Sequence, residues 1–341
     1  MRRVCCVITA RPSYSRAKSA LMALKDRAEL QIIAAASATV TRFGRIVDQI
    51  RTDGFEVSAE ISSVVEEDSL ANSALSTGVL LTQLPGILAS LRPDVVVTIA
   101  DRHETLATAI AASYQHIPLC HIQGGEVTGS IDDKVRNAIT QLADVHCVAT
   151  EKAAVRVSRM KPGADVHVTG CASIDLAAEA LRLGPTGERV PVVLQHPTTG
   201  EAALAAAQMR ATIEATRDFA AMYFWPGEEA GASGMSKALR LAGLKPTRNL
   251  PPVDFLRRLL GASCLVGNSS VGIRECAYLG VPVVNIGDRQ RNRERAENVV
   301  DVPAAAEAIR EAIWSVQRRR FSPSPRSVQA AGRSERARRR V

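Results

Sequence analysis

Short runs of apolar, often β-branched residues alternate along the chain with longer stretches in which apolar residues recur at helical spacing. The strand-like runs lie at 3–9, 30–36, 94–99, 117–121, 145–149, 165–169, 190–195, 221–225, 263–267 and 282–286. The helix-like stretches lie at 15–26, 40–52, 71–91, 103–114, 131–143, 151–158, 172–183, 200–217, 233–242, 253–260, 271–279 and 303–319. Strands that alternate with helices predict βαβ units and parallel sheets. Because so many strands exceed one comfortable sheet, we expect an α/β fold of two Rossmann-like, doubly wound domains facing each other across a cleft.

The pattern also suggests domain limits. We expect a first domain over 1–170, a second over 171–320 and a tail over 321–341, and the segment 183–189 (LGPTGER) is typical of a linker. The chain has 341 residues, of which 46% are hydrophobic and 23% charged, as in ordinary soluble globular proteins. This composition excludes disordered, collagen-like and coiled-coil chains.

The pattern contains no apolar run that approaches the roughly 18–20 residues needed to span a bilayer. The apolar stretch Val4–Thr9 is too short for the core of a signal peptide and is soon followed by Arg11. We therefore expect a cytoplasmic enzyme with no membrane partner.

The net charge of +8 is confined to the end of the chain. Residues 318–341 contain nine Arg and one Glu, with no Lys or Asp, so the rest of the chain is formally neutral. Such Arg/Ser/Pro/Ala ends are usually disordered, and we do not expect a nucleic-acid partner, although a basic tail can contact an anionic partner.

The seven cysteines form no Cys-x-x-Cys pair, and most lie inside apolar runs. This pattern favours small, buried, reduced side chains over a zinc site, and no metal is expected.

Polar residues follow two of the predicted strands in the first half. Arg11 and Arg16 come after the first strand, where guanidinium groups can meet phosphate or carboxylate, although a solvated surface pair is equally consistent. Asp101, Arg102, His103 and Glu104 follow the strand near 95–99. Asp101 could belong to a site or could cap the next helix.

The densest polar segment runs from His121 to Asp133 (HIQGGEVTGSIDD). Its adjacent glycines allow a ligand to approach the backbone closely, and its carboxylates and imidazole can transfer protons. The glycine spacing matches neither a dinucleotide fingerprint nor a P-loop. Ser130 and Asp133 also fit the start of a helix. One aspartate can therefore be structural while the other takes part in proton transfer.

In the second half, His196 ends a strand, a position that is more often structural. The segment 264–275 (CLVGNSSVGIRE) is more informative because a strand, a small-residue turn and a helix start together predict a diphosphate cradle. Glu275 lies where a carboxylate can accept hydrogen bonds from ribose hydroxyls.

Together these segments resemble the UDP-N-acetylglucosamine 2-epimerase family, from Arg11 to about Val302. The resemblance is strongest to its hydrolysing branch and to the epimerase half of the bifunctional sialic-acid-forming enzyme. The segments that carry it are Asp101-Arg102, 121–126 with 129–133 and Arg136, 195–197, 267–270 with 274–275, 285–290 and 294–299. The resemblance implies a GT-B-type fold and a homodimer formed through the first domain.

The resemblance also implies roles. Ser269 and Ser270 would hold the UDP diphosphate, Glu275 the ribose, and Arg11 and Arg289 further phosphate or sugar groups. The remaining candidates are, for catalysis, Asp101, Gln123, Glu126, Asp132, Arg136 and His196 and, for substrate contact, Arg16, Arg102, His121 and Asp133.

The implied substrate is a UDP-N-acetylhexosamine, and no cofactor is needed. The C2 proton is removed while UDP leaves C1, which gives a 2-acetamidoglucal. A proton then returns to the other face of C2. The product is UDP-N-acetylmannosamine or, if water adds, N-acetylmannosamine and UDP.

One position departs from the family. Gln123 stands where the family has a catalytic glutamate, and a glutamine side chain cannot act as a base. An engineered trapping variant, an enzyme that uses Glu126 or Asp101 instead, and a silent UDP-sugar-binding protein all fit this residue. Histidines common in hydrolysing relatives are also absent, and a GT-B glycosyltransferase would share the fold and the diphosphate cradle.

Overall fold

The computed structural model spans residues 1–341 and describes all of them except 66–68, 199–202, 228, 320 and 322–341. Almost all of the predicted tail is therefore outside the described residues. The described chain forms two compact units. The first comprises Met1–Glu126 and Ile131–Ser173, and the second comprises Val127–Ser130 and the chain from Ile174 onward.

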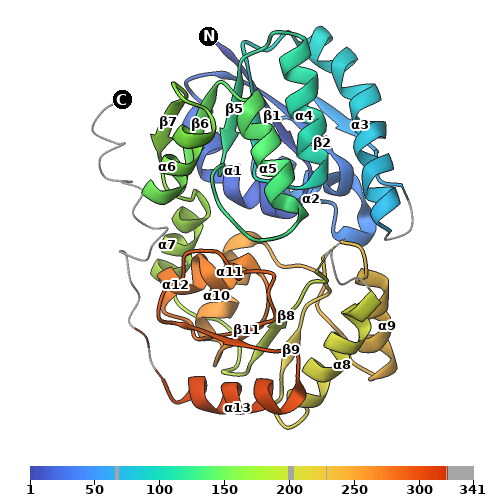
Figure 1. The fold of residues 1–341 in the computed structure, drawn as a ribbon, viewed down its shortest axis with the longest axis vertical. Coiled ribbons are helices and arrows are strands. Elements are labelled where there is room, and N and C mark those ends of the chain that lie inside the picture. Colours follow the sequence, from blue (N-terminus) through green and yellow to red (C-terminus); the bar gives the residue numbers. More distant parts are fainter. Residues whose placement is uncertain (66–68, 199–202, 228, 320, 322–341) are drawn as a thin grey trace. The chain divides into compact units, whose positions relative to one another are not determined.

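The first unit contains a seven-stranded sheet in the order β3-β2-β1-β4-β5-β6-β7 (Figure 1). Its strands are β1 (Arg3–Ile8), β2 (Glu29–Ala35), β3 (Ala59–Ile61), β4 (Val95–Ile99), β5 (Leu119–Ile122), β6 (Val145–Val148) and β7 (Asp165–Val168). All the pairings are parallel. The order reverses between β1 and β4, which is where doubly wound sheets bind ligands.

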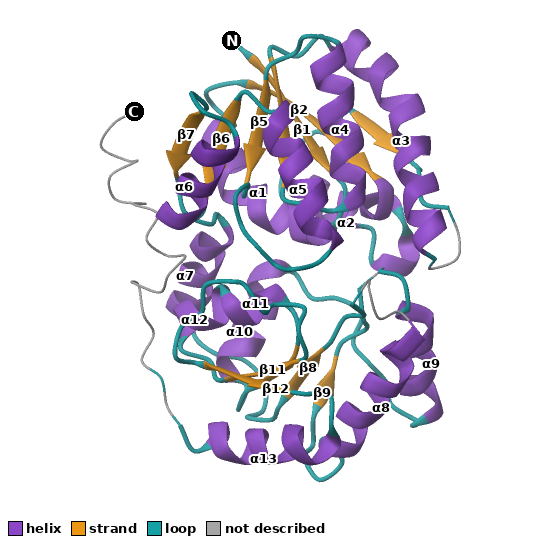
Figure 2. Cartoon of the chain, viewed as in Figure 1, coloured by secondary structure: helices purple, strands orange, loops and turns teal. Residues whose placement is uncertain are grey.

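Helices and short 3-10 turns connect these strands (Figure 2). The helices are α1 (Arg11–Leu24), α2 (Ile46–Thr52), α3 (Leu70–Leu91), α4 (His103–Tyr114), α5 (Ile131–Leu142) and α6 (Glu151–Met160). Two 3-10 turns, Ala36–Thr39 and Thr41–Phe43, precede α2.

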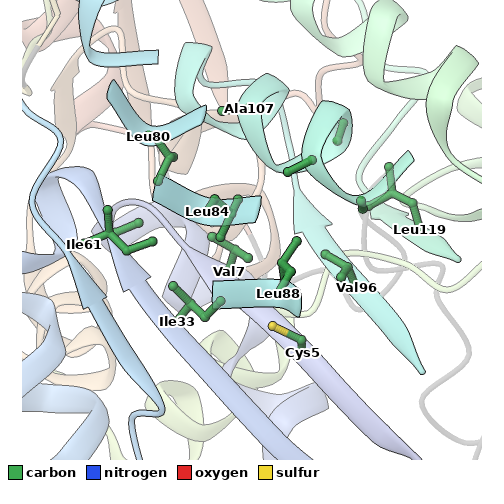
Figure 3. Close-up of a cluster of buried hydrophobic side chains, with 14 of the residues drawn as sticks. Cys5, Val7, Ile33, Ile61, Leu80, Leu84, Leu88, Val96, Ala107 and Leu119 are labelled. Carbon is green, nitrogen blue, oxygen red and sulfur yellow. The ribbon is translucent and has the colours of Figure 1, made fainter. Parts of the chain in front are cut away.

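Both faces of this sheet are buried. Cys5 and Val7 of β1 join the cluster that contains Leu80, Leu84 and Leu88 of α3, drawn in Figure 3. The alternate residues Cys6 and Ile8 join a second cluster with α1 and α2. Side chains of a strand alternate between faces, so burial of both faces explains why β1 is apolar throughout.

The second unit contains a five-stranded parallel sheet in the order β12-β11-β10-β8-β9. Its strands are β8 (Val192–Leu194), β9 (Met222–Tyr223), β10 (Leu265–Gly267), β11 (Val283–Ile286) and β12 (Val299–Val302). The helices are α7 (Ser173–Leu183), α8 (Ala205–Ala215), α9 (Ala232–Leu241), α10 (Pro252–Gly261), α11 (Ser270–Ile273), α12 (Glu275–Leu279) and α13 (Ala306–Gln317). Hydrophobic clusters cover both faces of this sheet too.

All ten predicted strands are present, and two further strands, β3 and β12, were not predicted. Both lie at a sheet edge, where one-sided burial permits polar residues such as Glu60 and Asp301 and weakens the apolar signal. The helix predicted over 271–279 is divided at Arg274 into α11 and α12.

Helix α3 corrects the expectation that no apolar segment reaches membrane-spanning length. Its 22 residues have a mean hydropathy of 1.5 over the most apolar window, long and apolar enough to cross a bilayer by length and composition alone. Serine, threonine and glycine divide the apolar residues of α3 into short runs but add no charge. The helix is therefore not recognised from the sequence as one long apolar segment. Leu80, Leu84 and Leu88 of α3 nevertheless belong to the core of the first unit.

Candidate functional site

In the first unit, polar residues gather where the central strands β1, β4 and β5 end. These three strands are neighbours and parallel, so their carboxyl ends lie along one edge of the sheet. Arg11 begins α1 after β1, Asp101 follows β4, and Gln123 follows β5. These three candidate residues therefore lie at the carboxyl edge of the sheet, where ligand-binding residues were predicted.

Arg136 of α5 organises the carboxylates of this edge. Its side chain is fully buried and donates two hydrogen bonds to Asp101 Oδ2, one of them from Nε at 3.0 Å. Nη1 donates to Asp133 Oδ1 at 2.5 Å and to the Glu126 carbonyl oxygen at 2.6 Å. Burial opposes the charge, but the paired carboxylates raise the pKa of Arg136 above its ordinary value. Four candidates are thereby brought together.

The two aspartates at the start of α5 differ in their surroundings. Asp133 is held by Arg136, whereas Asp132 lies half-buried in the same first turn. Both carboxylates are close to the N-terminus of α5, where negative charge is stabilised. Asp133 is thereby fixed by its ion pair with Arg136.

His121 is fully buried in β5. Its Nε2 lies 2.9 Å from the Ala100 carbonyl oxygen, and its Nδ1 has no partner among the described residues. Burial lowers the pKa of His121 to about 4, so the imidazole is neutral near pH 7. A neutral ring that donates from Nε2 holds the left-handed turn at Ala100 (φ 64°) just before Asp101.

The turn after β5 depends on two residues with positive φ. Gln123 has φ 66° and Gly125 φ 76°. A Cβ on Gly125 would lie 2.3 Å from the Ala153 carbonyl oxygen, so only glycine fits. Gln123 Nε2 donates to Cys171 Sγ at 2.7 Å, a contact that the sequence did not predict.

Arg102, predicted to contact substrate, makes a bidentate ion pair with Glu104 at 3.1 and 2.9 Å. Burial alone would raise the pKa of Glu104, but the Arg102 guanidinium lowers it below its ordinary value. Arg11 and Arg16 are half-buried on α1.

In the second unit, β8 and β10 are neighbours and the residues that follow them interlock. Asn268 Oδ1 accepts from the His196 amide, and Asn268 Nδ2 donates to the His196 carbonyl, each at 2.8 Å. His196 Nδ1 accepts from the Gly227 amide at 2.8 Å. In its neutral form the imidazole of His196 therefore carries its proton on Nε2, where it can donate to a ligand.

The predicted diphosphate cradle follows β10. A Cβ on Gly267 (φ 142°) would lie 2.1 Å from the Leu194 carbonyl oxygen, which fixes glycine at the end of the strand. Ser269 caps α11, and the hydroxyl of Ser270 accepts from Arg274 Nη1 at 3.2 Å. The two serines and the cationic side chain therefore lie together at the start of the helix.

Glu275 begins α12 with a carboxylate that is only 9% exposed. Its Oε2 has no hydrogen-bond partner among the described residues. A buried carboxylate without a partner is costly, so this atom is well suited to accept hydrogen bonds from ligand hydroxyls.

Arg289 lies beside this cradle. It makes an ion pair with Glu229 at 3.0 Å and donates to the Asn268 carbonyl oxygen at 3.3 Å, and Gln290 Nε2 donates to the same oxygen at 2.9 Å. The sequence did not predict this role of Asn268, because an amide that links two strand ends has no characteristic spacing.

Among the described residues, no group of three or more His, Cys, Asp or Glu side chains could hold a metal ion.

The chain is similar in sequence to known proteins. The profile of the UDP-N-acetylglucosamine 2-epimerase family matches residues 22–338. The chain is 28% identical to a hydrolysing UDP-N,N'-diacetylbacillosamine 2-epimerase of Legionella pneumophila, over 91% of this chain and 87% of the relative. It is 26% identical to the UDP-N-acetylglucosamine 2-epimerase of Neisseria meningitidis serogroup B, over 92% and 87%.

The fold matches as well. The crystal structure of Methanocaldococcus jannaschii UDP-GlcNAc 2-epimerase in complex with UDP-GlcNAc and UDP superimposes with a TM-score of 0.81 at 16% identity, over 99% of this chain and 98% of that chain. This match confirms the predicted α/β fold of GT-B type. The profile covers far more than half of the sequence, so the chain belongs to the UDP-N-acetylglucosamine 2-epimerase family.

Proposed function

We infer that this protein is a UDP-N-acetylglucosamine 2-epimerase, which inverts C2 through elimination of UDP and a 2-acetamidoglucal. The observation that carries this inference is the buried carboxylate of Glu275, whose Oε2 has no hydrogen-bond partner among the described residues. It begins the helix that follows Ser269 and Ser270. A carboxylate next to hydroxyl groups and Arg274 complements a ribose joined to a diphosphate. Family membership supplies the reaction class.

We assign nucleotide binding to the second unit. Ser269 and Ser270 bind the diphosphate, Glu275 binds the ribose, and Arg289 neutralises further negative charge. In the first unit, Arg11 is assigned to a further phosphate or sugar group. His196 donates from Nε2 to the sugar nucleotide, consistent with the hydrogen bond that Nδ1 accepts from Gly227. Stabilising the departing diphosphate is the largest contribution these residues can make to the reaction.

We assign the sugar chemistry to the first unit. Removal of the C2 proton requires a base, and its return to the opposite face requires an acid. We assign these transfers to the carboxylates Asp101, Asp132 and Glu126, and Arg136 fixes Asp101 and the Glu126 backbone. Arg16 and Arg102 lie on α1 and at the start of α4, at the same sheet edge.

Product analysis tests this function. The purified protein is incubated with UDP-N-acetylglucosamine, and the mixture is separated by anion exchange and identified by mass and NMR. UDP-N-acetylmannosamine identifies a non-hydrolysing enzyme, and UDP with free N-acetylmannosamine a hydrolysing one. Binding of the substrate without either product would contradict the proposal and indicate a silent binding protein.

We further propose a homodimer that forms through α3. This helix has no charged residue, its Leu70 and Leu75 are 55% and 56% exposed, and a Cβ on Gly78 or Gly86 would meet nothing within 4 Å. An uncharged apolar face of this length is unusual on a monomer in water. A second copy of the chain would cover it with the same face.

Light scattering tests the dimer. Leu75→Glu should yield a monomer, whereas Leu241→Glu, at a 79% exposed position on α9, should leave the dimer intact. A monomeric wild-type protein would contradict the proposal.

We also propose a cytoplasmic location. All seven cysteines are free, including Cys120 and Cys147, whose sulfur atoms are 3.9 Å apart. Unbonded thiols at such a separation favour a reducing compartment.

A further inference from the structure

Cys171 differs from the cysteines that pack in the hydrophobic clusters. Cys5 and Cys264 pack in hydrophobic clusters, where burial raises the pKa of each thiol to about 12. Cys171 is 5% exposed but belongs to none of the hydrophobic clusters of the described residues. Polar groups surround its sulfur instead.

Two side chains contact that sulfur. Gln123 Nε2 donates to Cys171 Sγ at 2.7 Å, and Ser173 Oγ lies 2.9 Å from the same atom. Ser173 is also the first residue of α7, so the thiol lies just before a helix N-terminus. The Gln123 donor directed at the sulfur and the nearby helix N-terminus both favour the thiolate over the thiol.

Gln123 supplies an independent indication of a ligand. Its side chain is 1% exposed, and Oε1 has no hydrogen-bond partner among the described residues. A buried amide oxygen left unpaired is costly, and a donor from a ligand would satisfy it. The substrate of the proposed function carries such a donor, because the N–H of its acetamido group is attached to C2.

A hydrogen bond from the acetamido N–H to Gln123 Oε1 would bring C2 to the sulfur that Gln123 Nε2 already contacts. One amide would then bind the substrate nitrogen through its oxygen and the thiolate through its nitrogen. The Gln123 side chain cannot itself accept a proton. In this arrangement it binds the substrate and orients the thiolate instead.

We propose that Cys171 is the base that removes the C2 proton, with Gln123 as the residue that positions it. The assignment rests on the proposed 2-epimerase function. The proton of C2 moves to Sγ, the electrons of the C2–H bond form the C1=C2 double bond, and those of the C1–O bond leave with UDP. A different group then returns a proton to the opposite face of C2 while a phosphate oxygen of UDP, or water, adds to C1. The thiol loses its proton to solvent.

The first test compares Cys171→Ala with Cys5→Ala, a cavity-forming change of the same size in the core of the same unit. Incorporation of deuterium at C2 is followed by NMR in D₂O, and UDP affinity is measured to check folding. We expect Cys171→Ala to slow exchange by about 100-fold or more with UDP affinity unchanged, as loss of an acid–base group does. Exchange by Cys171→Ala at the rate of Cys5→Ala would overturn the assignment.

The double variant C171A/Q123E separates chemistry from structure. A glutamate at 123 places a carboxylate next to the position of the lost thiolate. That carboxylate can accept the C2 proton, so deuterium exchange at C2 should return. A purely structural role of Cys171 would not be rescued by this change, and continued inactivity of a double variant that binds UDP would count against the proposal.

A readout without turnover completes the design. The ultraviolet absorbance of wild type minus that of Cys171→Ala, followed against pH, reports the Cys171 thiolate. We expect it to titrate below the ordinary cysteine pKa of about 8.5 and to shift upward in Gln123→Ala. If wild type binds UDP but shows no exchange, the 2-epimerase function fails, and the base assignment fails with it. If wild type exchanges but the thiolate titrates at or above about 8.5, only the Cys171 assignment fails.

Discussion

Arg136 is the charged side chain on which the carboxylates of the first unit depend. It is fully buried and binds Asp101, Asp133 and the Glu126 carbonyl. Arg136→Ala would leave these groups without their partner, and breaking a buried pair costs about 3–5 kcal/mol. We expect urea unfolding to show a loss of that size.

The control for this variant is Arg217→Ala, which removes an exposed pair with Glu214. Its cost should be about 1 kcal/mol or less. Equal costs for the two variants would show that Arg136 does not organise this edge.

His121 predicts a dependence of stability on pH. The pKa is about 4 in the folded protein, lowered by burial, and about 6.5 in an unfolded chain. Between these values only the unfolded state binds the proton, so stability is constant above about 6.5 and falls as the pH is lowered toward about 4. The loss should be about 3 kcal/mol.

His121→Gln keeps a donor for the Ala100 carbonyl but cannot titrate, so its stability relative to wild type should improve over that pH range. His167→Gln, at a side chain that is 56% exposed, should show no such change. Parallel stability curves for wild type and His121→Gln would refute the linkage.

Glu275 connects stability to binding. Glu275→Gln removes a buried charge without a partner on Oε2, so the ligand-free protein should be at least as stable as wild type. UDP affinity measured by calorimetry should fall by about tenfold or more, because hydrogen bonds to a charged group contribute about 1.5–3 kcal/mol. The exposed Glu307→Gln should change neither quantity, and undiminished affinity in Glu275→Gln would remove Glu275 from the ribose site.

At the scale of elements, the turn after β5 holds Gln123 in place. Gly125→Ala would set a methyl group 2.3 Å from the Ala153 carbonyl oxygen, in addition to the strain of φ 76°. Gly163→Ala provides a matched control, because its φ is 82° and nothing lies within 4 Å of an added Cβ.

We expect Gly163→Ala to cost about 1–2 kcal/mol from backbone strain alone. Gly125→Ala should cost clearly more in thermal or urea unfolding, since the backbone around Ala153 must also move. Similar costs would mean that the close approach is not rigid.

Strands and helices were largely predictable from the sequence because both faces of each sheet are buried. Val95–Ile99 and Val283–Ile286 each contain one polar residue among β-branched apolar ones, whereas the unpredicted β12 contains an exposed Asp301 at a sheet edge. Residue types in order also predicted Ser269, Ser270 and Glu275 as a group. The pairing of Asp133 with Arg136 had only a helical spacing to indicate it.

The contact between Gln123 and Cys171 could not be predicted from the sequence. The two residues are 48 positions apart, and a single cysteine between Gly170 and Ala172 has no characteristic spacing to indicate its partner. Only the parallel order of β5, β6 and β7, which brings their carboxyl ends to one edge, places them together.

For the whole molecule, two Rossmann-like units divide the work that we propose. The second unit binds the nucleotide through the residues after β8, β10 and β11, and the first supplies the groups that act on C2. This division predicts that changes in the first unit alter exchange at C2 more than UDP affinity, and that changes in the second do the reverse.

The central claim is that the protein breaks the C2–H bond of a UDP-N-acetylhexosamine. Proton NMR of UDP-N-acetylglucosamine in D₂O with the wild-type protein measures this directly. We expect the C2 proton signal to decay as deuterium enters and signals of the manno epimer to appear, with UDP either attached or released. Full retention of the C2 proton by a protein that binds the substrate would contradict the account.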